Sequence, residues 1–318
     1  MTEHHMKARE DAGSFRSFFR HVKYEHLLAG LSGGVCSTLA LHPLDVIKVR
    51  LQAYDGVNSD PHRSYSGLRH AFRSIYMEHG WKGFYQGVIP NLWGAGLAWG
   101  LYFFGFNFLK DAIKGDKRQT LTAKEHLITG ILTGAGTLSL TNPIWVTKTR
   151  LIVQNDSANH ASKSTHYHGM IDTLIKTWKH EGIQGLYKGF LPGLFGVSHG
   201  ALQFMAYEEL KKFHSSYFGT PVDKKLSSSD YIVMAALSKI FASATTYPYQ
   251  VVRTRLQDQY NIERYNGALD VVIKTWRFEG FRGFYKGLFP NLLRVTPACC
   301  ITFVTYENVL SLLQSENK

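Results

Sequence analysis

Three short segments of the chain each combine a proline with two basic residues at fixed spacing. They are Pro43–Arg50, Pro143–Arg150 and Pro248–Arg255, and the basic residues occupy the fifth and seventh places after the proline. A proline inside a helix removes a backbone hydrogen bond and kinks the helix. Basic side chains just after such a kink can form ion pairs or bind an anion. The pattern therefore predicts one local structure that is built three times.

A lysine within an apolar segment is the second candidate for chemistry. Lys239 lies nine residues before Pro248, in the segment AALSKIFASATTYP. A charged side chain inside a membrane is costly, and it persists where a partner or a water-filled cavity offsets the cost. A purely structural ion pair is the alternative. We favour the functional interpretation, in which Lys239 contacts a solute.

Long, mostly apolar segments position these residues. Each copy of the pattern opens with a segment long enough to cross about 30 Å of hydrocarbon; the three are 24–52, 124–154 and 230–257. A polar loop follows, and then a short amphipathic segment whose basic residues alternate with apolar ones, as in a helix on a membrane surface. A second long apolar segment completes each copy, opened by a proline in its first turn: 91–113, 193–213 and 291–313.

The sequence thus predicts an all-α membrane protein with six transmembrane helices in three pseudo-symmetric repeats. The expected parts are a polar N-terminal tail at 1–23 and repeats at 24–115, 116–220 and 221–318, which together form one transmembrane domain. A soluble helical repeat protein is the alternative. It is disfavoured because runs such as NLWGAGLAWGLYFFGFNFL would have to be buried on every side.

Composition narrows the function further. A net charge of +12 and an isoelectric point near 9.5 indicate an anionic partner. The basic residues are spread over all polar segments, which argues against nucleic acid as that partner. No nucleophile–base pair, metal cluster or phosphate-binding loop is visible, so we expect neither an enzyme nor a bound metal or cofactor. The first 23 residues mix acids and bases without an apolar core, which predicts an uncleaved tail rather than a targeting peptide.

The triplicated motif resembles that of the mitochondrial carrier family: Pro-x-acid-x-x-basic-x-basic, then acid-Gly and aromatic-basic-Gly. The match extends from about Tyr24 to Leu313. The resemblance implies six tilted helices in the mitochondrial inner membrane, with the amphipathic helices on the matrix side and both termini in the intermembrane space. It also implies alternating access to a central site, in a monomer surrounded by lipids such as cardiolipin.

In that family the motif residues close the matrix side as a ring, next to the helix kinks at Pro43, Pro143 and Pro248. Transferred by position, the expected matrix gate consists of the pairs Asp45–Lys148, Trp145–Arg253 and Gln250–Lys48, braced by Gln52 and Gln257. Only the first is an ion pair, since Trp145 and Gln250 replace acids. A cation–π contact and a hydrogen bond would serve instead, and these weaker contacts are expected to ease opening.

A second ring is expected to close the cytoplasmic side, from the family motif aromatic-acid-x-x-basic. Its candidates are Asn107, Lys110, Glu208, Lys211 and Glu307. The second copy is complete, whereas Asn107 replaces an acid and Glu307 lacks a basic partner. Lys110 is expected to contact Glu208 or Glu307. His79 and Gln86 are further departures, from the acid-Gly and aromatic-basic-Gly motifs of the first repeat.

The family's solute contacts lie thirteen residues before the acid of the cytoplasmic motif. This offset gives Arg294, Gly94, Ala95, Phe195 and Gly196. The other residues of the predicted solute site are Lys239, Trp99, His199 and Gln203. Lys239 and Arg294 indicate an anionic solute, the glycines leave room, and aromatic faces can stack on a flat ring.

Within the family, segments such as PIWVTKTR and TYPYQVVR are similar to the branch that carries folates and flavin adenine dinucleotide. The resemblance implies alternating-access transport of tetrahydrofolate or FAD between cytosol and matrix, with FAD as cargo and not as cofactor. NAD and pyrimidine nucleotides, carried by neighbouring branches, are the alternatives. A non-transporting scaffold or receptor is a further alternative, disfavoured by the intact prolines and basic residues.

Overall fold

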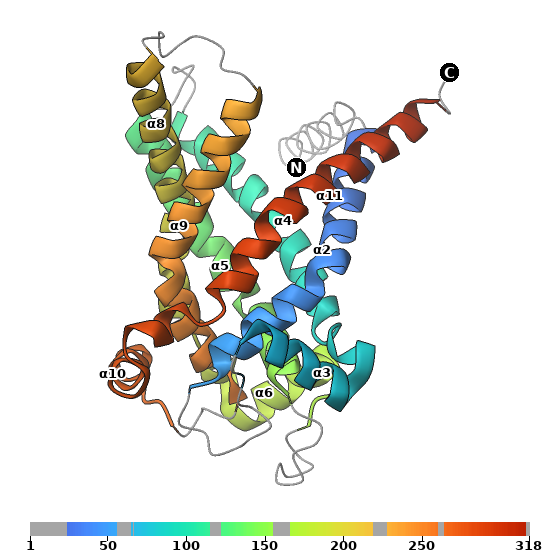
Figure 1. Cartoon of the computed structure of the whole chain (residues 1–318), viewed down its shortest axis with the longest axis vertical. Helices are drawn as coiled ribbons and strands as arrows, with labels where there is room; N and C mark the ends of the chain where they lie inside the picture. The colour runs from blue at the N-terminus through green and yellow to red at the C-terminus, as the bar shows by residue number, and fades with distance from the viewer. Residues whose placement is uncertain are drawn as a thin grey trace, which may run out of the picture. The chain divides into compact units, whose positions relative to one another are not determined.

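The computed structural model describes residues 24–55, 65, 67–114, 122–154, 166–218, 228–259 and 264–315, and every regular element in these ranges is helical (Figure 1). The all-α prediction is therefore confirmed for this part of the chain. The predicted tail at 1–23 lies outside the described residues.

The first long helix of each copy continues through its proline without a break. These helices are α2 (Tyr24–Ala53), α5 (Ala123–Val153) and α9 (Ser228–Gln257), with Pro43, Pro143 and Pro248 inside them. Their ends lie within two residues of the predicted segments. Thr122 caps α5, because its hydroxyl accepts from the backbone N–H of Glu125 while the Glu125 carboxylate accepts from that of Thr122.

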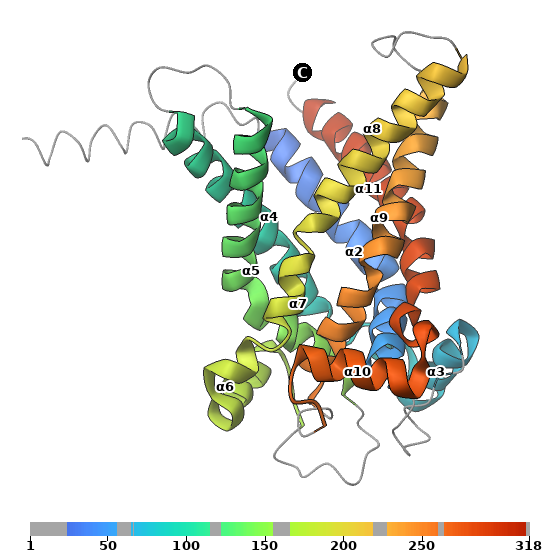
Figure 2. The ribbon, with the colours of Figure 1, turned by 90° about the vertical axis from the view of Figure 1, so that its left-hand side faces the viewer.

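The amphipathic segments form short helices that lie beside the ends of the long ones (Figure 2). They are α3 (Leu68–Gly83), α6 (Met170–Leu186) and α10 (Ala268–Glu279), the last followed by the 3₁₀ helix η4 (Phe281–Tyr285). Gly80, Gly182 and Gly280 occupy equivalent places, with φ between 59° and 64° and ψ near −155° to −158°. Only glycine adopts this conformation without strain, so these residues fix the turn toward the next long helix.

The second long helices are α4 (Val88–Lys114), α8 (Ser198–Phe218) and α11 (Leu288–Ser315). The prediction of one continuous helix over 193–213 is wrong, because α7 (Phe190–Phe195) ends before α8 begins. Glycine lowers helix stability, and Gly196 occupies the break. A Cβ on Gly196 would lie 2.7 Å from the Tyr249 hydroxyl, so the ring of Tyr249 packs directly against bare backbone.

Two described stretches are long and apolar enough to cross a membrane: Val88–Ile113, and Phe281–Leu313, which joins η4 to α11. The chain divides into two compact units. One contains the residues up to Leu41 and from Arg294 onward, and the other contains His42–Leu293. In the first unit the Ser37 hydroxyl donates to the carbonyl of Ala298 at 3.2 Å, so α2 and α11 pack against each other there.

Within the larger unit, the three motif segments meet around a shared buried region. Val46, Val146 and Val251, three places after each proline, are completely buried. The sixth place after one proline faces the ninth place after the next. At two of these boundaries the pair is polar: the Thr149 hydroxyl donates to Gln257 Oε1 at 2.8 Å, and the Thr254 hydroxyl donates to Gln52 Oε1 at 3.0 Å.

At the boundary between α2 and α5, the same two places are apolar. They hold Val49 and Ile152, which belong to one buried core cluster. An apolar pair thus stands at this boundary in place of the threonine–glutamine pair of the other two. A glutamine facing Val49 would be costly, because a buried amide without a hydrogen-bond partner costs about 1–3 kcal/mol.

Ile152→Gln alone is therefore expected to destabilise the protein by about 1–3 kcal/mol, since the new amide would face Val49. Adding Val49→Thr to that variant should restore most of the loss by rebuilding the threonine–glutamine pair. Thermal unfolding of purified protein in detergent measures both effects. A double variant no more stable than Ile152→Gln would contradict the pairing.

Candidate functional site

The structure brings together two of the three predicted matrix-gate pairs. Lys148 Nζ lies 2.5 Å from Asp45 Oδ2, and both side chains are largely buried. Lys48 Nζ donates to Gln250 Oε1 at 2.9 Å. The first contact is an ion pair between α2 and α5, and the second is a charge-assisted hydrogen bond between α2 and α9. Neither requires a rigid fit, because each rests on a long lysine side chain.

The third predicted pair differs from the prediction. Lys148 Nζ lies 5.4 Å from the ring centre of Trp145, three residues earlier on the same helix face, and the indole N–H donates to the Thr141 hydroxyl at 3.2 Å. Arg253 instead donates to Asn142 Oδ1 at 3.4 Å. Within the described residues no cation–π contact joins Trp145 to Arg253. Trp145 thus contacts Lys148 on its own helix, and the Asn142 amide, not the tryptophan ring, binds Arg253.

A second ring, formed by the last arginine of each motif, was not predicted from the sequence. Each arginine Nε donates to the backbone carbonyl nine places after the next proline. The contacts are Arg50 to Ile152 at 3.0 Å, Arg150 to Gln257 at 3.3 Å, and Arg255 to Gln52 at 3.1 Å. Because the acceptor is backbone, the ring tolerates isoleucine where the other two copies have glutamine. No side-chain pattern could have revealed it.

In the second and third repeats, the same arginines also bind the short helices. Arg150 forms an ion pair with Glu181, which in turn lies 2.9 Å from Lys188. Burial alone would raise the pKa of the Glu181 carboxyl, but hydrogen bonds and charge from Arg150 and Lys188 outweigh it and lower that pKa. Glu181 is therefore ionised at neutral pH. Arg255 repeats the arrangement with Glu279, at 2.7 Å.

In the first repeat the corresponding arginine binds a glutamine and a tyrosine on either side of the short helix. His79 and Gln86 stand where the other copies have glutamate and lysine. Arg50 Nη2 donates to Gln86 Oε1 at 2.7 Å, and Nη1 donates to the Tyr65 hydroxyl at 3.3 Å. The glutamine therefore accepts directly from the arginine of its own repeat.

The residue before each proline also binds the next loop. His42 Nε2 lies 2.9 Å from the carbonyl oxygen of Gln86, Asn142 Nδ2 donates to that of Lys188 at 3.4 Å, and the Tyr247 hydroxyl donates to that of Lys286 at 3.1 Å. Three different side chains thus make the same contact, so this position shows no common residue type in the sequence.

The predicted solute residues of the larger unit lie on several helices. Lys239 is half-buried on α9, and His199 is half-buried on α8. His199 Nδ1 lies 3.0 Å from the Thr246 hydroxyl, and the imidazole interacts electrostatically with Lys239 and Lys48. Two lysines and a histidine therefore share one region, as a site for an anion requires.

The glycines predicted to leave room for the solute do so only in part. A Cβ on Gly94 would lie 3.4 Å from the Trp145 ring, and one on Gly196 would meet Tyr249. Aromatic side chains of the adjoining helices already occupy those spaces. Ala95 and Gln203 are half-buried, whereas the side chains of Trp99 and Phe195 are exposed.

Of the remaining predicted residues, Arg294 is half-buried on α11 in the smaller unit, which also holds the exposed Glu307. In the larger unit Asn107 is exposed, while Lys110, Glu208 and Lys211 are half-buried. Among the described residues of that unit, no ion pair joins Lys110 to Glu208.

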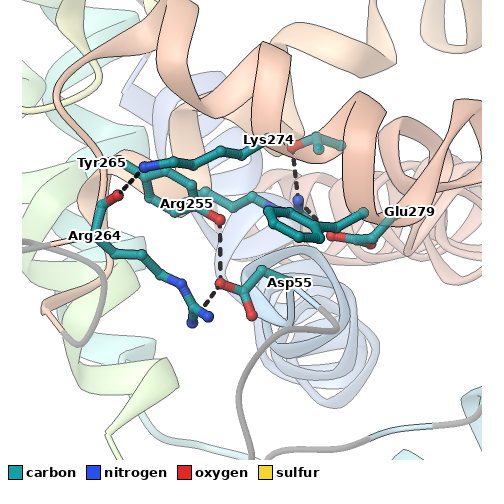
Figure 3. A pocket seen from close by; sticks show the side chains of 8 residues that line it. Asp55, Arg255, Arg264, Tyr265, Lys274 and Glu279 are labelled. Atoms are coloured by element: carbon teal, nitrogen blue, oxygen red, sulfur yellow. Dashed lines mark hydrogen bonds and ion pairs between the residues drawn. The ribbon is translucent and has the colours of Figure 1, made fainter.

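A small cavity lies between the end of α2, the loop before α10, and α10 itself (Figure 3). Its lining includes Asp55, Arg255, Arg264 and Tyr265, and its volume of about 10 Å³ is space for about one water molecule. The cavity is therefore too small to hold an organic solute.

Comparison with known proteins identifies the family. The family model for the mitochondrial carrier protein matches the chain three times, over residues 20–117, 119–218 and 224–317. A relative from Arabidopsis thaliana, Folate transporter 1, chloroplastic, is 40% identical over 301 residues, which cover 92% of this chain and 96% of the relative.

Two further relatives are named for another solute. Nicotinamide adenine dinucleotide transporter 2, mitochondrial, from Arabidopsis thaliana is 36% identical over 288 residues, covering 89% of this chain and 77% of that protein. The mitochondrial nicotinamide adenine dinucleotide transporter 1 of Saccharomyces cerevisiae is 36% identical over 282 residues, covering 88% and 74%. Because the three matches to the family model cover nearly all of the chain, this chain belongs to the mitochondrial carrier protein family and is a membrane transporter, not an enzyme.

Proposed function

We propose that the protein carries folate, as tetrahydrofolate, or FAD across the mitochondrial inner membrane by alternating access. The observation that carries this proposal is Lys239. It is half-buried within α9, and within the described residues its side chain forms no hydrogen bond and no ion pair. Because an unneutralised charge inside a membrane is costly, a negatively charged solute is the natural counter-ion.

Other predicted residues suit an anion with a flat ring. His199 interacts electrostatically with Lys239 in the larger unit, and the smaller unit holds Arg294 as a further predicted cation. Phe195 and Trp99 expose aromatic faces on which a pteridine or isoalloxazine ring could stack. The folate transporter among the relatives supports this choice of solute.

The network around the prolines supports the alternating-access part of the proposal. Asp45–Lys148 and Lys48–Gln250 join α2 to α5 and α9 by contacts that can break and reform. In the proposed cycle these contacts close the matrix side while the solute enters from the cytosol. Solute binding then offsets their loss as the matrix side opens.

The proposed membrane arrangement has six tilted spanning helices: α2, α4, α5, α7 together with α8, α9 and α11. The short helices α3, α6 and α10 then lie on the matrix face, and both termini are in the intermembrane space. Cardiolipin would surround a monomer. Length supports this assignment, since 30 residues of α2 or α9 extend about 45 Å.

Uptake by purified protein in liposomes tests the proposal. Labelled tetrahydrofolate, FAD, NAD and a pyrimidine nucleotide are offered separately, against liposomes that contain either buffer or the unlabelled solute. We expect uptake of tetrahydrofolate or FAD that exceeds uptake by protein-free liposomes. Absence of uptake for all four solutes, by protein that unfolds cooperatively, would refute transport of this solute class.

NAD is the second candidate, because the relatives named as NAD transporters cover almost as much of this chain as the folate transporter does. NAD is also an anion with flat rings, so Lys239 serves it equally well. Competition decides between them: the true solute reduces uptake of the others at the lowest concentration.

A further inference from the structure

The end of α2 is bound to the third repeat by its backbone. The carbonyl of Tyr54, one residue after the helix, accepts from Arg255 Nη2 at 3.0 Å and from Lys286 Nζ at 3.3 Å. Lys286 Nζ also lies 4.6 Å from the centre of the Tyr54 ring. Two cations at a helix C-terminus are favourable, because the carbonyl end carries partial negative charge.

Asp55, the next residue, adds a side-chain contact of its own. Its carboxylate is 1% exposed, and Oδ2 accepts from Arg264 Nη1 at 2.8 Å and from the Tyr265 hydroxyl at 3.1 Å (Figure 3). Burial and the charge of Asp55 raise the pKa of Tyr265, so its phenol keeps the proton that it donates. A carboxylate buried this fully is stable only with such partners.

The equivalent end of α5 binds differently. Gln154, which follows α5 directly, accepts from the backbone N–H of Tyr167 at 2.7 Å and donates to the Tyr167 carbonyl at 3.0 Å. Both contacts lie within the second repeat. The end of α2 thus contacts the third repeat through Tyr54 and Asp55, whereas these two contacts of Gln154 stay within the second repeat.

The boundary that Asp55 crosses is one of the two at which the predicted gate lacks an ion pair. There Gln250 stands in place of an acid and offers only an amide oxygen to Lys48. Asp55 and Arg264 place an ion pair at this same boundary, between α2 and the segment that follows α9. The gate pair Lys48–Gln250 is not an ion pair, but Asp55 and Arg264, which follow α2 and α9 in the sequence, form one at the same boundary.

We propose that Asp55 is a positioning residue of the transport cycle, a latch that holds the first and third repeats together and is released whenever the matrix side opens. The proposal rests on the alternating-access function proposed above. It follows because a movement that separates Lys48 from Gln250 and Gln52 from Thr254 also draws Asp55 away from Arg264.

A reversible cross-link tests the latch. Asp55→Cys and Arg264→Cys are combined in protein whose Cys36, Cys299 and Cys300 have been replaced by serine. A short bis-methanethiosulfonate reagent joins the two thiols, and a reductant removes it. Uptake in liposomes is expected to fall at least tenfold on cross-linking and to return after reduction. The two single-cysteine variants, treated identically, should show the same uptake after the reagent as before it.

Uptake that persists after complete cross-linking would overturn the latch while leaving the transport function intact. A wild-type protein that takes up none of the solutes would instead refute the proposed function. If the double variant shows no uptake before the reagent is added, a second experiment uses Thr254→Cys, whose buried side chain lies on the same boundary. Its reaction with a thiol reagent should accelerate several-fold in Asp55→Asn but not in Asp55→Glu, and equal rates in all three backgrounds would also overturn the latch.

Discussion

Replacing Lys239 by alanine is expected to abolish solute uptake while the protein still folds. The lysine side chain is half-buried in α9 and interacts electrostatically with His199. In the proposed mechanism, its removal takes away the charge that balances an anionic solute inside the membrane. Loss of a buried charge contact typically costs about 3–5 kcal/mol, so uptake should fall by about two to four orders of magnitude. Initial rates in liposomes measure this.

The matched control for Lys239→Ala is Lys212→Ala. Lys212 is an exposed lysine near the end of α8 that pairs with Glu209 on its own helix, and surface pairs of this kind contribute little. Its replacement should leave uptake unchanged. Lys239→Arg keeps the charge on a longer side chain and should retain part of the activity. Wild-type uptake by Lys239→Ala would remove the lysine from the solute site.

The helices were predictable because their signals are local. Apolar length and the proline motif place the ends of α2, α5 and α9 within two residues. The amphipathic pattern likewise predicts one short helix in each copy, which the structure contains as α3, α6 and α10. The break between α7 and α8 was not predictable, because it depends on Tyr249 packing against Gly196 from another helix. Glycine in the sequence shows that such an approach is permitted, but not that it occurs.

The contacts of the candidate site likewise include some that the sequence predicts and some that it does not. The contact between Asp45 and Lys148 follows from residue types at repeated positions, and the structure contains it. The arginine ring does not follow, because its acceptors are backbone carbonyls, which every residue has. Nor does the contact of Asp55 with Arg264, because that aspartate lies outside the repeated motif. A repeated motif predicts contacts between side chains at equivalent positions. It does not predict contacts to backbone groups or contacts made by residues outside the motif.

The three boundaries of the larger unit differ in chemistry. The first has the ion pair Asp45–Lys148 above an apolar pair, Val49 and Ile152. The second binds its arginine through the amide of Asn142. Unequal contacts of this kind mean that the boundaries need not separate together. Among the described residues, the boundary between α5 and α9 has neither a gate ion pair nor a latch, so we expect it to separate most easily. That boundary contains Trp145, in the place where the family motif has an acid.

Trp145→Asp is therefore expected to slow turnover by about tenfold or more. The new carboxylate would stand between Lys148, which already lies beside the Trp145 ring, and Arg253, which has only an amide partner among the described residues. A hydrogen bond to a charged group contributes about 1.5–3 kcal/mol, and each 1.4 kcal/mol added to the opening step slows it tenfold. Turnover is measured in liposomes at saturating solute.

Size is the confounding effect in that experiment, because the indole also packs against Gly94 and its loss leaves a space there. Trp145→Asn controls for it, since asparagine has the shape of aspartate without the charge. A stronger gate requires Trp145→Asp to turn over more slowly than Trp145→Asn and to recover as salt is raised, because added ions screen partly exposed charges. Equal rates in the two variants would mean that packing on Gly94, and not the strength of the ring, sets the rate at which this boundary opens.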